Sequence, residues 1–318
     1  MKHIIKSIFI LFVPFYFFNI IFIFSKSSTT DFLELKKLKN VPASIQIANT
    51  GSSHGWDFNY DGLTDKTTFN FSLRAQTLLY DKAVLSNFID NFAPESVLLI
   101  PVSYFEIDSI PAENLIESFE FRYYLTLQKK NIPNSTLAKE IKYKYFILLT
   151  QNNPLKTIKS NFLKSVEQLK KHKSKKNENS SDGNFSLLSD LEQRKQAEFV
   201  KSSWQNMYKK KGLDYNKKIL CEMIELCRKN CITPVIVTTP ITSVQNSVFE
   251  DGIFFQTFNT FKNDLTSKTK VLWLDYSNDK NFSSSYDLFS DTNHMNKKGS
   301  NFFTKKVLQD LKELNLLK

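Results

Sequence analysis

Glycine is scarce in this sequence: 7 of 318 residues, against 29 phenylalanines. An average protein holds about 7% glycine, so each glycine here says more than usual about a turn or a close backbone approach. Neither GxGxxG nor GxxxxGK[ST] occurs, so the sequence gives no sign of the glycine-rich phosphate cradles. We expect no cofactor.

Cysteine is also scarce, and the three cysteines fall on or just after one predicted helix: Cys221, Cys227 and Cys231. The spacing of six places the first two on different faces, and no spacing resembles a zinc knuckle. We interpret all three as small core residues and expect no metal. Their odd number leaves at least one thiol unpaired, which argues mildly against an oxidising destination.

Acidic residues do not balance the basic ones, and the formal net charge is +11. The scattered lysines, with abundant Asn, Ile and Phe, are typical of an AT-rich genome; the alternative is a basic surface for anionic headgroups or an acidic polysaccharide. Acidic side chains are scattered, and we interpret them as surface charge. The polar stretch 170–184 could bind nucleic acid in a cytoplasmic protein, but the apolar N-terminus argues against this, and we expect no nucleic-acid partner.

Residues 7–24 contain no ionisable side chain and are about long enough to span a bilayer as a helix. The flanking basic residues favour an inside N-terminus and an outside remainder. A cleaved signal peptide is the alternative, but no A-x-A-like site follows Phe24. We predict a membrane anchor at 1–26, a stalk at 27–41 and a domain at 42–318 on the outer (periplasmic or extracytoplasmic) side of a single-pass membrane protein.

Five short stretches predict strands, and helical segments separate them: 44–50, 67–71, 97–102, 234–240 and 271–276. The apolar run 97–102 is typical of a strand buried on both faces. This alternation predicts a mainly parallel five-stranded sheet between two helical layers, an α/β fold of the α/β/α type. Helical and polar residues from about 112 to 210 interrupt the alternation, and we treat them as an insertion with a flexible tip.

The string NTGSSHG, residues 49–55, ends the first predicted strand. Functional sites collect at the carboxyl ends of parallel strands. Gly51 and Gly55 bracket Ser52 and Ser53, as in a tight turn that exposes a serine hydroxyl and nearby N–H donors. Alone, such a string is equally typical of an ordinary strand-to-helix loop.

The string DTNHMNKKG, residues 291–299, precedes the last predicted helix. An aspartate three residues before a histidine can hold one imidazole nitrogen and leave the other free to act as a base. The alternative is a loop histidine that caps the helix. Of the four histidines, His3 lies beside the anchor and His172 in the polar stretch, which leaves His54 and His294. We expect His54, next to the serine pair, to line the pocket mouth.

In order and spacing, the serine turn and the later DxxH string resemble the SGNH/GDSL hydrolase superfamily over about residues 42–315. The resemblance implies the flavodoxin-like sheet of the SGNH hydrolase fold. It also implies a catalytic triad with Ser53 as nucleophile, His294 as base and Asp291 orienting the imidazole. The chain is most similar to membrane-anchored members that add or remove acyl groups on cell-envelope polymers, whose serine block often reads GSS.

The sequence departs from this family at two oxyanion blocks. The second block, FNFSLRAQT, holds Asn70 and Ser72 but no glycine, and the third, PVSYF, has Ser103 where the family has asparagine. A lost oxyanion donor costs on the order of a hundredfold in turnover. The substitutes that we consider are Ser72, Ser103 and Gln76, with Asn70 and His54 as further pocket residues.

The resemblance implies an acyl-enzyme mechanism on acyl groups, foremost acetyl, of an envelope polysaccharide or glycan. Transfer of the acyl group to water makes an esterase, and transfer to a sugar hydroxyl makes an O-acyltransferase. The expected partners are an acylated glycan or small acyl ester, the lipid bilayer through residues 7–24, and a membrane acyl donor. The alternative is an inactive relative that binds glycans or scaffolds an envelope polysaccharide system.

Overall fold

The computed structural model describes residues 13, 16–17, 35–104, 106–108, 113–146, 184–207, 212–249 and 253–317. They belong to two compact units, one of residues 1–40 with 113–180 and one of residues 41–112 with 181–318. The predicted anchor lies outside the described residues, except for residues 13, 16 and 17. None of the helices in the described ranges has the length and apolar character needed to cross a membrane.

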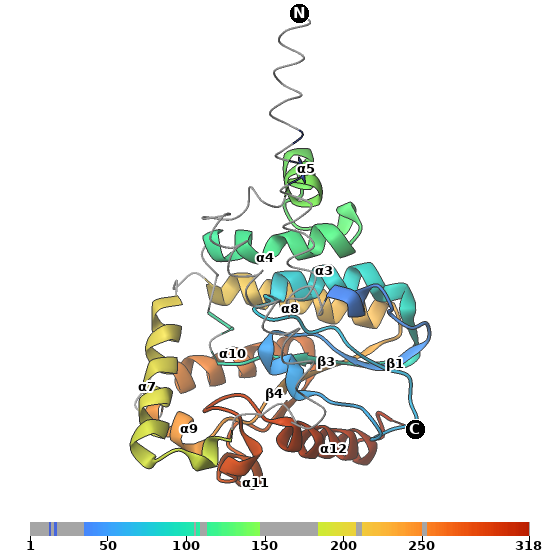
Figure 1. The fold of residues 1–318 in the computed structure, drawn as a ribbon. Coiled ribbons are helices and arrows are strands. Elements are labelled where there is room, and N and C mark those ends of the chain that lie inside the picture. Colours follow the sequence, from blue (N-terminus) through green and yellow to red (C-terminus); the bar gives the residue numbers. More distant parts are fainter. Residues whose placement is uncertain are drawn as a thin grey trace, which may run out of the picture. The chain divides into compact units, whose positions relative to one another are not determined.

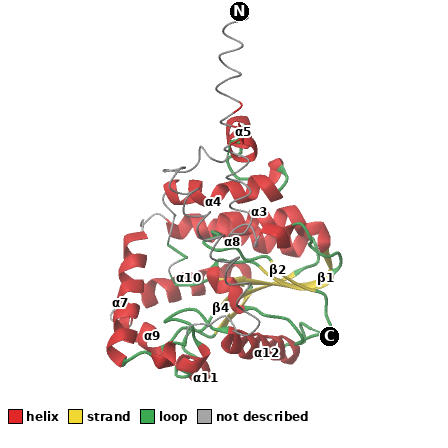
Figure 2. Ribbon diagram, in the orientation of Figure 1, coloured by secondary structure: helices red, strands yellow, loops and turns green. Residues whose placement is uncertain are grey.

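The second unit is built on a five-stranded sheet in the order β2-β1-β3-β4-β5, and every neighbouring pair is parallel. Figure 2 shows strands of this sheet in yellow, between helices. The strands are β1 (Ile45–Asn49), β2 (Thr68–Asn70), β3 (Phe92–Pro101), β4 (Thr233–Thr238) and β5 (Leu272–Asp275). This confirms the predicted α/β class and parallel five-stranded sheet. The order is the flavodoxin-like one that the resemblance implied.

The strand β3 begins at Phe92, earlier than the predicted start at residue 97. Its first five residues, FAPES, include a proline and two polar residues and are not typical of a strand. The register with β1 is irregular here, since Ile45 lies opposite Phe92 while Ile47 lies opposite Val97. A bulge thus accommodates residues whose sequence is typical of a loop.

Helices cover both faces of the sheet. On one side, α3 (Leu78–Phe88) packs against α8 (Gly212–Lys229), and α8 packs against α10 (Ile253–Thr269). Figure 1 shows α3 and α8 on one side and α12 (Lys297–Glu313) on the other. The 3-10 helix η1 (Ser53–Asp57) lies against α12. The three-layer arrangement follows from strands that are apolar on both faces.

The remaining elements of the second unit are η2 (Ile89–Asn91), η5 (Phe185–Leu187), α7 (Asp190–Met207), α9 (Ser243–Phe249), α11 (Lys280–Ser283) and η6 (Tyr286–Leu288). All of them are short except α7, which packs against α9. The described residues 184–207 therefore belong to the unit that holds the sheet, although the sequence placed them within the insertion.

The helix α8 has the regular spacing of apolar residues that predicts a helix with one buried face. Leu220, Met223, Ile224 and Cys227 recur at the i, i+3, i+4, i+7 spacing, and all four are buried. Burial of Cys227 agrees with its interpretation as a core residue. Cys231 lies beyond the helix end and is exposed, so that interpretation was wrong for Cys231.

The core between the sheet and α12 joins strand and helix side chains. Ile47, Leu99 and Val237 point to this side and form one buried cluster with Phe303 and Val307 of α12. Fully burying such side chains stabilises the fold by roughly 1.5–3 kcal/mol each. This packing fixes α12, and with it the loop that precedes α12, against the carboxyl edge of the sheet.

The first unit contains α4 (Glu113–Thr126), η3 (Lys129–Asn131) and α5 (Leu137–Tyr145). The hydroxyl of Thr136 caps α5 by accepting from the backbone N–H of Lys139. Buried Glu120 of α4 accepts hydrogen bonds from Tyr143 and Lys139, both at 2.9 Å. These bonds join α4 to α5 within the unit.

Candidate active site

The serine turn follows β1 and depends on two glycines. Gly51 has φ +117°, a conformation that side chains disfavour. At Gly55, a Cβ atom would lie 2.5 Å from the Cβ atom of Ser72, which belongs to the loop after β2. The chain then enters η1 at Ser53. The positive φ at Gly51 and the close packing against Ser72 at Gly55 therefore require glycine at both positions that bracket the serine pair.

The structure brings together the three residues of the predicted triad. The Oγ atom of Ser53 lies 2.9 Å from Nε2 of His294, although 241 residues separate them in sequence. The Nδ1 atom of His294 lies 2.9 Å from Oδ2 of Asp291. The two hydrogen bonds form one continuous relay from hydroxyl through imidazole to carboxylate, as nucleophile activation requires.

Electrostatics within this relay favour a charged pair. Burial disfavours the charged imidazole, but the hydrogen bond and negative charge of Asp291 outweigh it and raise the pKa of His294. Burial likewise opposes ionisation of Asp291, yet the hydrogen bond and charge of His294 lower the pKa of Asp291. The His294 side chain is 31% exposed, so a substrate can reach it.

The loop that carries Asp291 and His294 is held on three sides. Its Thr292 carbonyl accepts from the backbone N–H and the hydroxyl of Thr242, which follows β4. The backbone N–H of Met295 donates to Oδ1 of Asp57 in η1 at 3.2 Å. Asn296 caps α12 by accepting from Gly299. These hydrogen bonds hold the backbone on both sides of His294, so the position of its imidazole is fixed.

Three of the predicted oxyanion or pocket residues instead support the serine turn. The Asn70 amide donates to the carbonyls of Gly55 and Phe58, and its oxygen accepts from the N–H and hydroxyl of Ser72. The amide of Gln76 is buried and donates to Asp81 at 2.7 Å. These contacts make the three side chains scaffold for the turn.

Open donors lie at the turn and beside it. The N–H of Ser53 and the hydroxyl of Ser103 have no hydrogen-bond partner among the residues that the structure describes. A bridge through Glu106 brings Ser103 beside the turn: one carboxyl oxygen accepts from the Ser52 hydroxyl at 2.7 Å, the other from the Ser103 N–H at 2.9 Å. Ser103 thus lies beside the turn that carries the nucleophile, with a hydroxyl free to donate.

Three acidic residues around the turn are buried, although the sequence predicted that acidic side chains lie on the surface. Burial raises the pKa of Asp57 to about 8, and burial raises the pKa values of Asp81 and Glu106 to about 7. Asp81 accepts from the N–H of Gly51 at 2.7 Å. Their importance depends on burial by distant segments, and no local pattern signals it.

His54 is placed differently from the prediction. Its side chain is 1% exposed, so it lies beneath the site and does not line the pocket mouth. Its ring stacks on that of His294, with ring centroids 5.0 Å apart and planes 23° apart. The reason is the conformation of η1, in which the side chain of His54 is turned into the protein interior.

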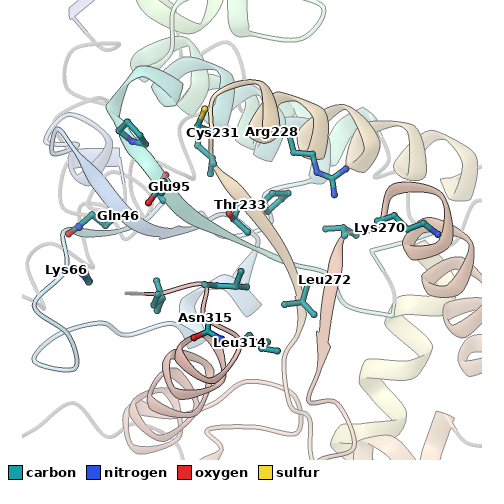
Figure 3. A pocket seen from close by; sticks show the side chains of 17 residues that line it. Gln46, Lys66, Glu95, Arg228, Cys231, Thr233, Lys270, Leu272, Leu314 and Asn315 are labelled. Carbon is teal, nitrogen blue, oxygen red and sulfur yellow. The ribbon is translucent and has the colours of Figure 1, made fainter.

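A cleft of about 850 Å³ lies elsewhere, at the edge of the sheet where β1, β3, β4 and β5 begin (Figure 3). Its lining includes Glu95, Arg228 and Lys270, and none of the triad residues contributes to it. An ester attacked by Ser53 would therefore not occupy this cleft.

A metal centre of protein ligands is not visible in the described part of the chain. There, no group of three or more His, Cys, Asp or Glu side chains is arranged to hold an ion.

Comparisons with known proteins give structural neighbours only. No family model and no curated protein matches the chain. It is similar to a presumed acylhydrolase from Bacteroides fragilis, with 11% identity, TM-score 0.40 and coverage of 89% of this chain and 95% of that one. A Bacillus subtilis protein has 11% identity, TM-score 0.41 and coverage of 86% and 58%. A GDSL-like lipase from Bacteroides thetaiotaomicron has 8% identity, TM-score 0.39 and coverage of 90% and 98%.

Proteins named for the acylhydrolase and GDSL classes are thus among the structural neighbours. The low identities and TM-scores say nothing about the reaction of this chain.

Proposed function

We propose that this chain is a serine ester hydrolase or acyltransferase of the SGNH/GDSL type, with Ser53 as the nucleophile. The observation that carries the proposal is the relay of hydrogen bonds from Ser53 through His294 to Asp291. It lies where β1 ends, at the carboxyl edge of a parallel sheet, the usual place for such sites.

The geometry supports one sequence of proton movements. As Oγ of Ser53 attacks the ester carbonyl carbon, Nε2 of His294 takes the hydroxyl proton. The Asp291 carboxylate stabilises the resulting imidazolium, consistent with the raised pKa of His294. Nε2 then returns the proton to the departing alkoxide oxygen as its bond to carbon breaks, which leaves an acyl group on Ser53.

The negative charge on the carbonyl oxygen needs donors that are fixed in advance. We assign this role to the N–H of Ser53, an open donor at the turn, and to the hydroxyl of Ser103, an open donor beside it. The turn itself is held by Asp81 through the N–H of Gly51. The Ser103 hydroxyl thereby takes the place of the family's asparagine, beside the N–H of Ser53.

The second half of the reaction determines the product. Water attacking the acyl-enzyme gives an esterase, and a sugar hydroxyl gives an O-acyltransferase. Ser53 is partly exposed and the His294 side chain is 31% exposed, so a substituent of a large glycan has access to both. We propose acyl, foremost acetyl, groups of an envelope glycan as substrate. An anchor at residues 7–24 would hold the domain beside that polymer and a membrane acyl donor.

The test is hydrolysis of p-nitrophenyl acetate by purified wild type, Ser53→Ala and Ser52→Ala. We expect turnover by the wild type, loss of at least a thousandfold in Ser53→Ala, and a loss of no more than about tenfold in Ser52→Ala, since that hydroxyl bonds to Glu106 and takes no part in the relay. A well-folded wild type without turnover would contradict the proposal and favour a glycan-binding or scaffolding role on the same fold.

A further inference from the structure

His54 lies beside the proposed catalytic residues but takes no part in the proton transfers described above. It follows Ser53 directly within η1, and its side chain is 1% exposed. Its ring lies against one face of the His294 ring, at a centroid distance of 5.0 Å. One face of the proposed base therefore meets another imidazole instead of solvent.

Hydrogen bonds fix the proton on His54. Its Nε2 atom lies 3.4 Å from the amide nitrogen of Asn293, which can only donate, so Nε2 accepts. The proton is then on Nδ1, which donates to Oγ1 of Thr239 at 3.2 Å. A doubly protonated ring would direct an N–H at the Asn293 amide. Asn293 thus favours one neutral tautomer, and the Thr239 hydroxyl, which can donate or accept, is compatible with it.

These contacts join three separate parts of the fold. Thr239 follows β4, Asn293 lies in the loop of Asp291 and His294, and His54 belongs to η1. Asn293 also donates its backbone N–H to the Asp291 carboxylate at 2.9 Å. The orientation of His54 is therefore coupled to the loop that carries the base.

The electrostatic surroundings agree with a permanently neutral ring. Burial, and then the charge of His294, lower the pKa of His54 to about 3. Asp57, whose Oδ2 atom is 4.0 Å from Nδ1 of His54, is a buried acid with a pKa of about 8. Near neutral pH, the layer beneath His294 therefore carries no charge that would oppose protonation of His294.

We propose that His54 is a positioning residue for the reaction at Ser53. Its neutral ring, locked by Thr239 and Asn293, supports the His294 imidazole in the plane that faces the Ser53 hydroxyl and excludes water from that side. The inference rests on the proposed function, and it adds a second imidazole that takes no proton itself.

The first test compares His54→Ala with the wild type in p-nitrophenyl acetate hydrolysis. We expect kcat to fall about 10- to 100-fold with little change in KM, because a base that leaves its productive geometry loses rate and not binding. Thr239→Val, similar in shape, removes only the partner of Nδ1 and should lower kcat about 3- to 10-fold. The stability control is Leu311→Ala, a core truncation in α12 that should lower the melting temperature and leave kcat unchanged.

The pH profile provides a readout that a merely structural role would not move. The charged and titratable groups that affect His294 are Asp291 and Asp57, which raise its pKa, and Arg74, which lowers it. Removal of the His54 ring admits water, which favours the charged imidazole. The acid limb of kcat/KM should shift to higher pH in His54→Ala and stay in place in His54→Phe, which retains a ring.

The outcomes separate the inference from the function beneath it. An inactive wild type contradicts the proposed function. An active wild type with unchanged kcat and pH profile in His54→Ala overturns the role of His54, as does an equal loss of kcat in Leu311→Ala. If His54→Ala does not fold, Thr239→Val decides, and a kcat equal to that of the wild type overturns the proposal.

Discussion

Asp291 illustrates how one side chain sets the chemistry of its neighbour. Its hydrogen bond to Nδ1 of His294 selects the tautomer whose Nε2 accepts the Ser53 proton. Asp291→Asn can donate instead of accept, which favours the wrong tautomer. We predict a loss of kcat on the order of a thousandfold or more.

The same substitution should change the pH dependence. The base acts only when neutral, and Asp291 raises the pKa of His294 above its ordinary value of 6.5. The acid limb of kcat/KM should therefore lie above pH 6.5 in the wild type and move to lower pH in Asp291→Asn. Stopped assays from pH 5 to 9 measure both, and coincident profiles would contradict the assignment.

Ser103 is the second residue whose role is directly testable. Its hydroxyl is an open donor beside the turn, while its N–H is bonded to Glu106. Ser103→Ala keeps that backbone bond and removes only the hydroxyl. We predict a drop in kcat of about 10- to 100-fold at unchanged melting temperature. Wild-type turnover in this variant would assign the oxyanion to other donors.

Asp81 should make stability depend on pH. Burial raises its pKa from 3.8 to about 7, so between these values the folded chain keeps a proton that the unfolded chain has lost. Stability from this group is complete below about pH 4 and is lost as pH rises to 7, by an amount on the order of a few kcal/mol. Asp81→Asn has no proton to lose, so its unfolding free energy should fall less over this window.

Urea unfolding at pH 4, 5, 6 and 7 measures this difference. Exposed Asp61→Asn, which should leave the wild-type slope unchanged, is the matched control. If the unfolding free energy changed equally with pH in the wild type and Asp81→Asn, the pKa of Asp81 would not be raised in the folded chain.

The sequence allowed prediction of those site residues whose meaning lies in local patterns. Ser53 stands between two rare glycines, and Asp291 precedes His294 by three residues. Glu106 and Asp81 could not be found in this way, because an isolated acid gains significance only when distant segments bury it. His54 was misplaced for the same reason: its neighbours Thr239 and Asn293 are remote in sequence.

At the scale of elements, the serine turn depends on how closely two loops approach. At Gly55, an added Cβ would meet the Cβ atom of Ser72, which is attached to backbone and cannot swing away. We predict that Gly55→Ala costs about 1 to 3 kcal/mol and abolishes most turnover by displacing Ser53. Thermal unfolding and p-nitrophenyl acetate hydrolysis measure the two effects.

The control for this prediction is Gly62→Asn. Gly62 also has positive φ, +70°, but no atom lies within 4 Å of an added Cβ, and asparagine tolerates this conformation. Near-wild-type stability and activity are expected. If Gly55→Ala behaved in the same way, the close packing of the two loops would not be needed for the site.

Strands were predictable as elements because their apolar runs are distinct, whereas their limits were not. The start of β3 at Phe92 includes Glu95 and Ser96, which lie in the irregular stretch between the pairs Ile45–Phe92 and Ile47–Val97. Likewise, the polar surroundings of α7 gave no indication that it packs against α9. Tertiary contacts override local composition in both cases.

At the scale of the whole second unit, strand order determines which loops meet. With β1 between β2 and β3, the ends of these strands bring Ser72 and Ser103 to the two sides of the serine turn. Packing of α12 under the sheet then returns the loop of His294 to β1. The parallel α/β class could be read from the sequence, but the meeting of side chains 241 positions apart required the fold.

The most direct test of the account is the site of covalent modification. Wild type, Ser53→Ala and Ser52→Ala are treated with a serine-directed fluorophosphonate, and tandem mass spectrometry locates the adduct. We predict one adduct per chain, on Ser53, in the wild type and Ser52→Ala, and none in Ser53→Ala. An adduct on Ser52, or none in folded wild-type protein, would contradict the claim that Ser53 is an activated nucleophile.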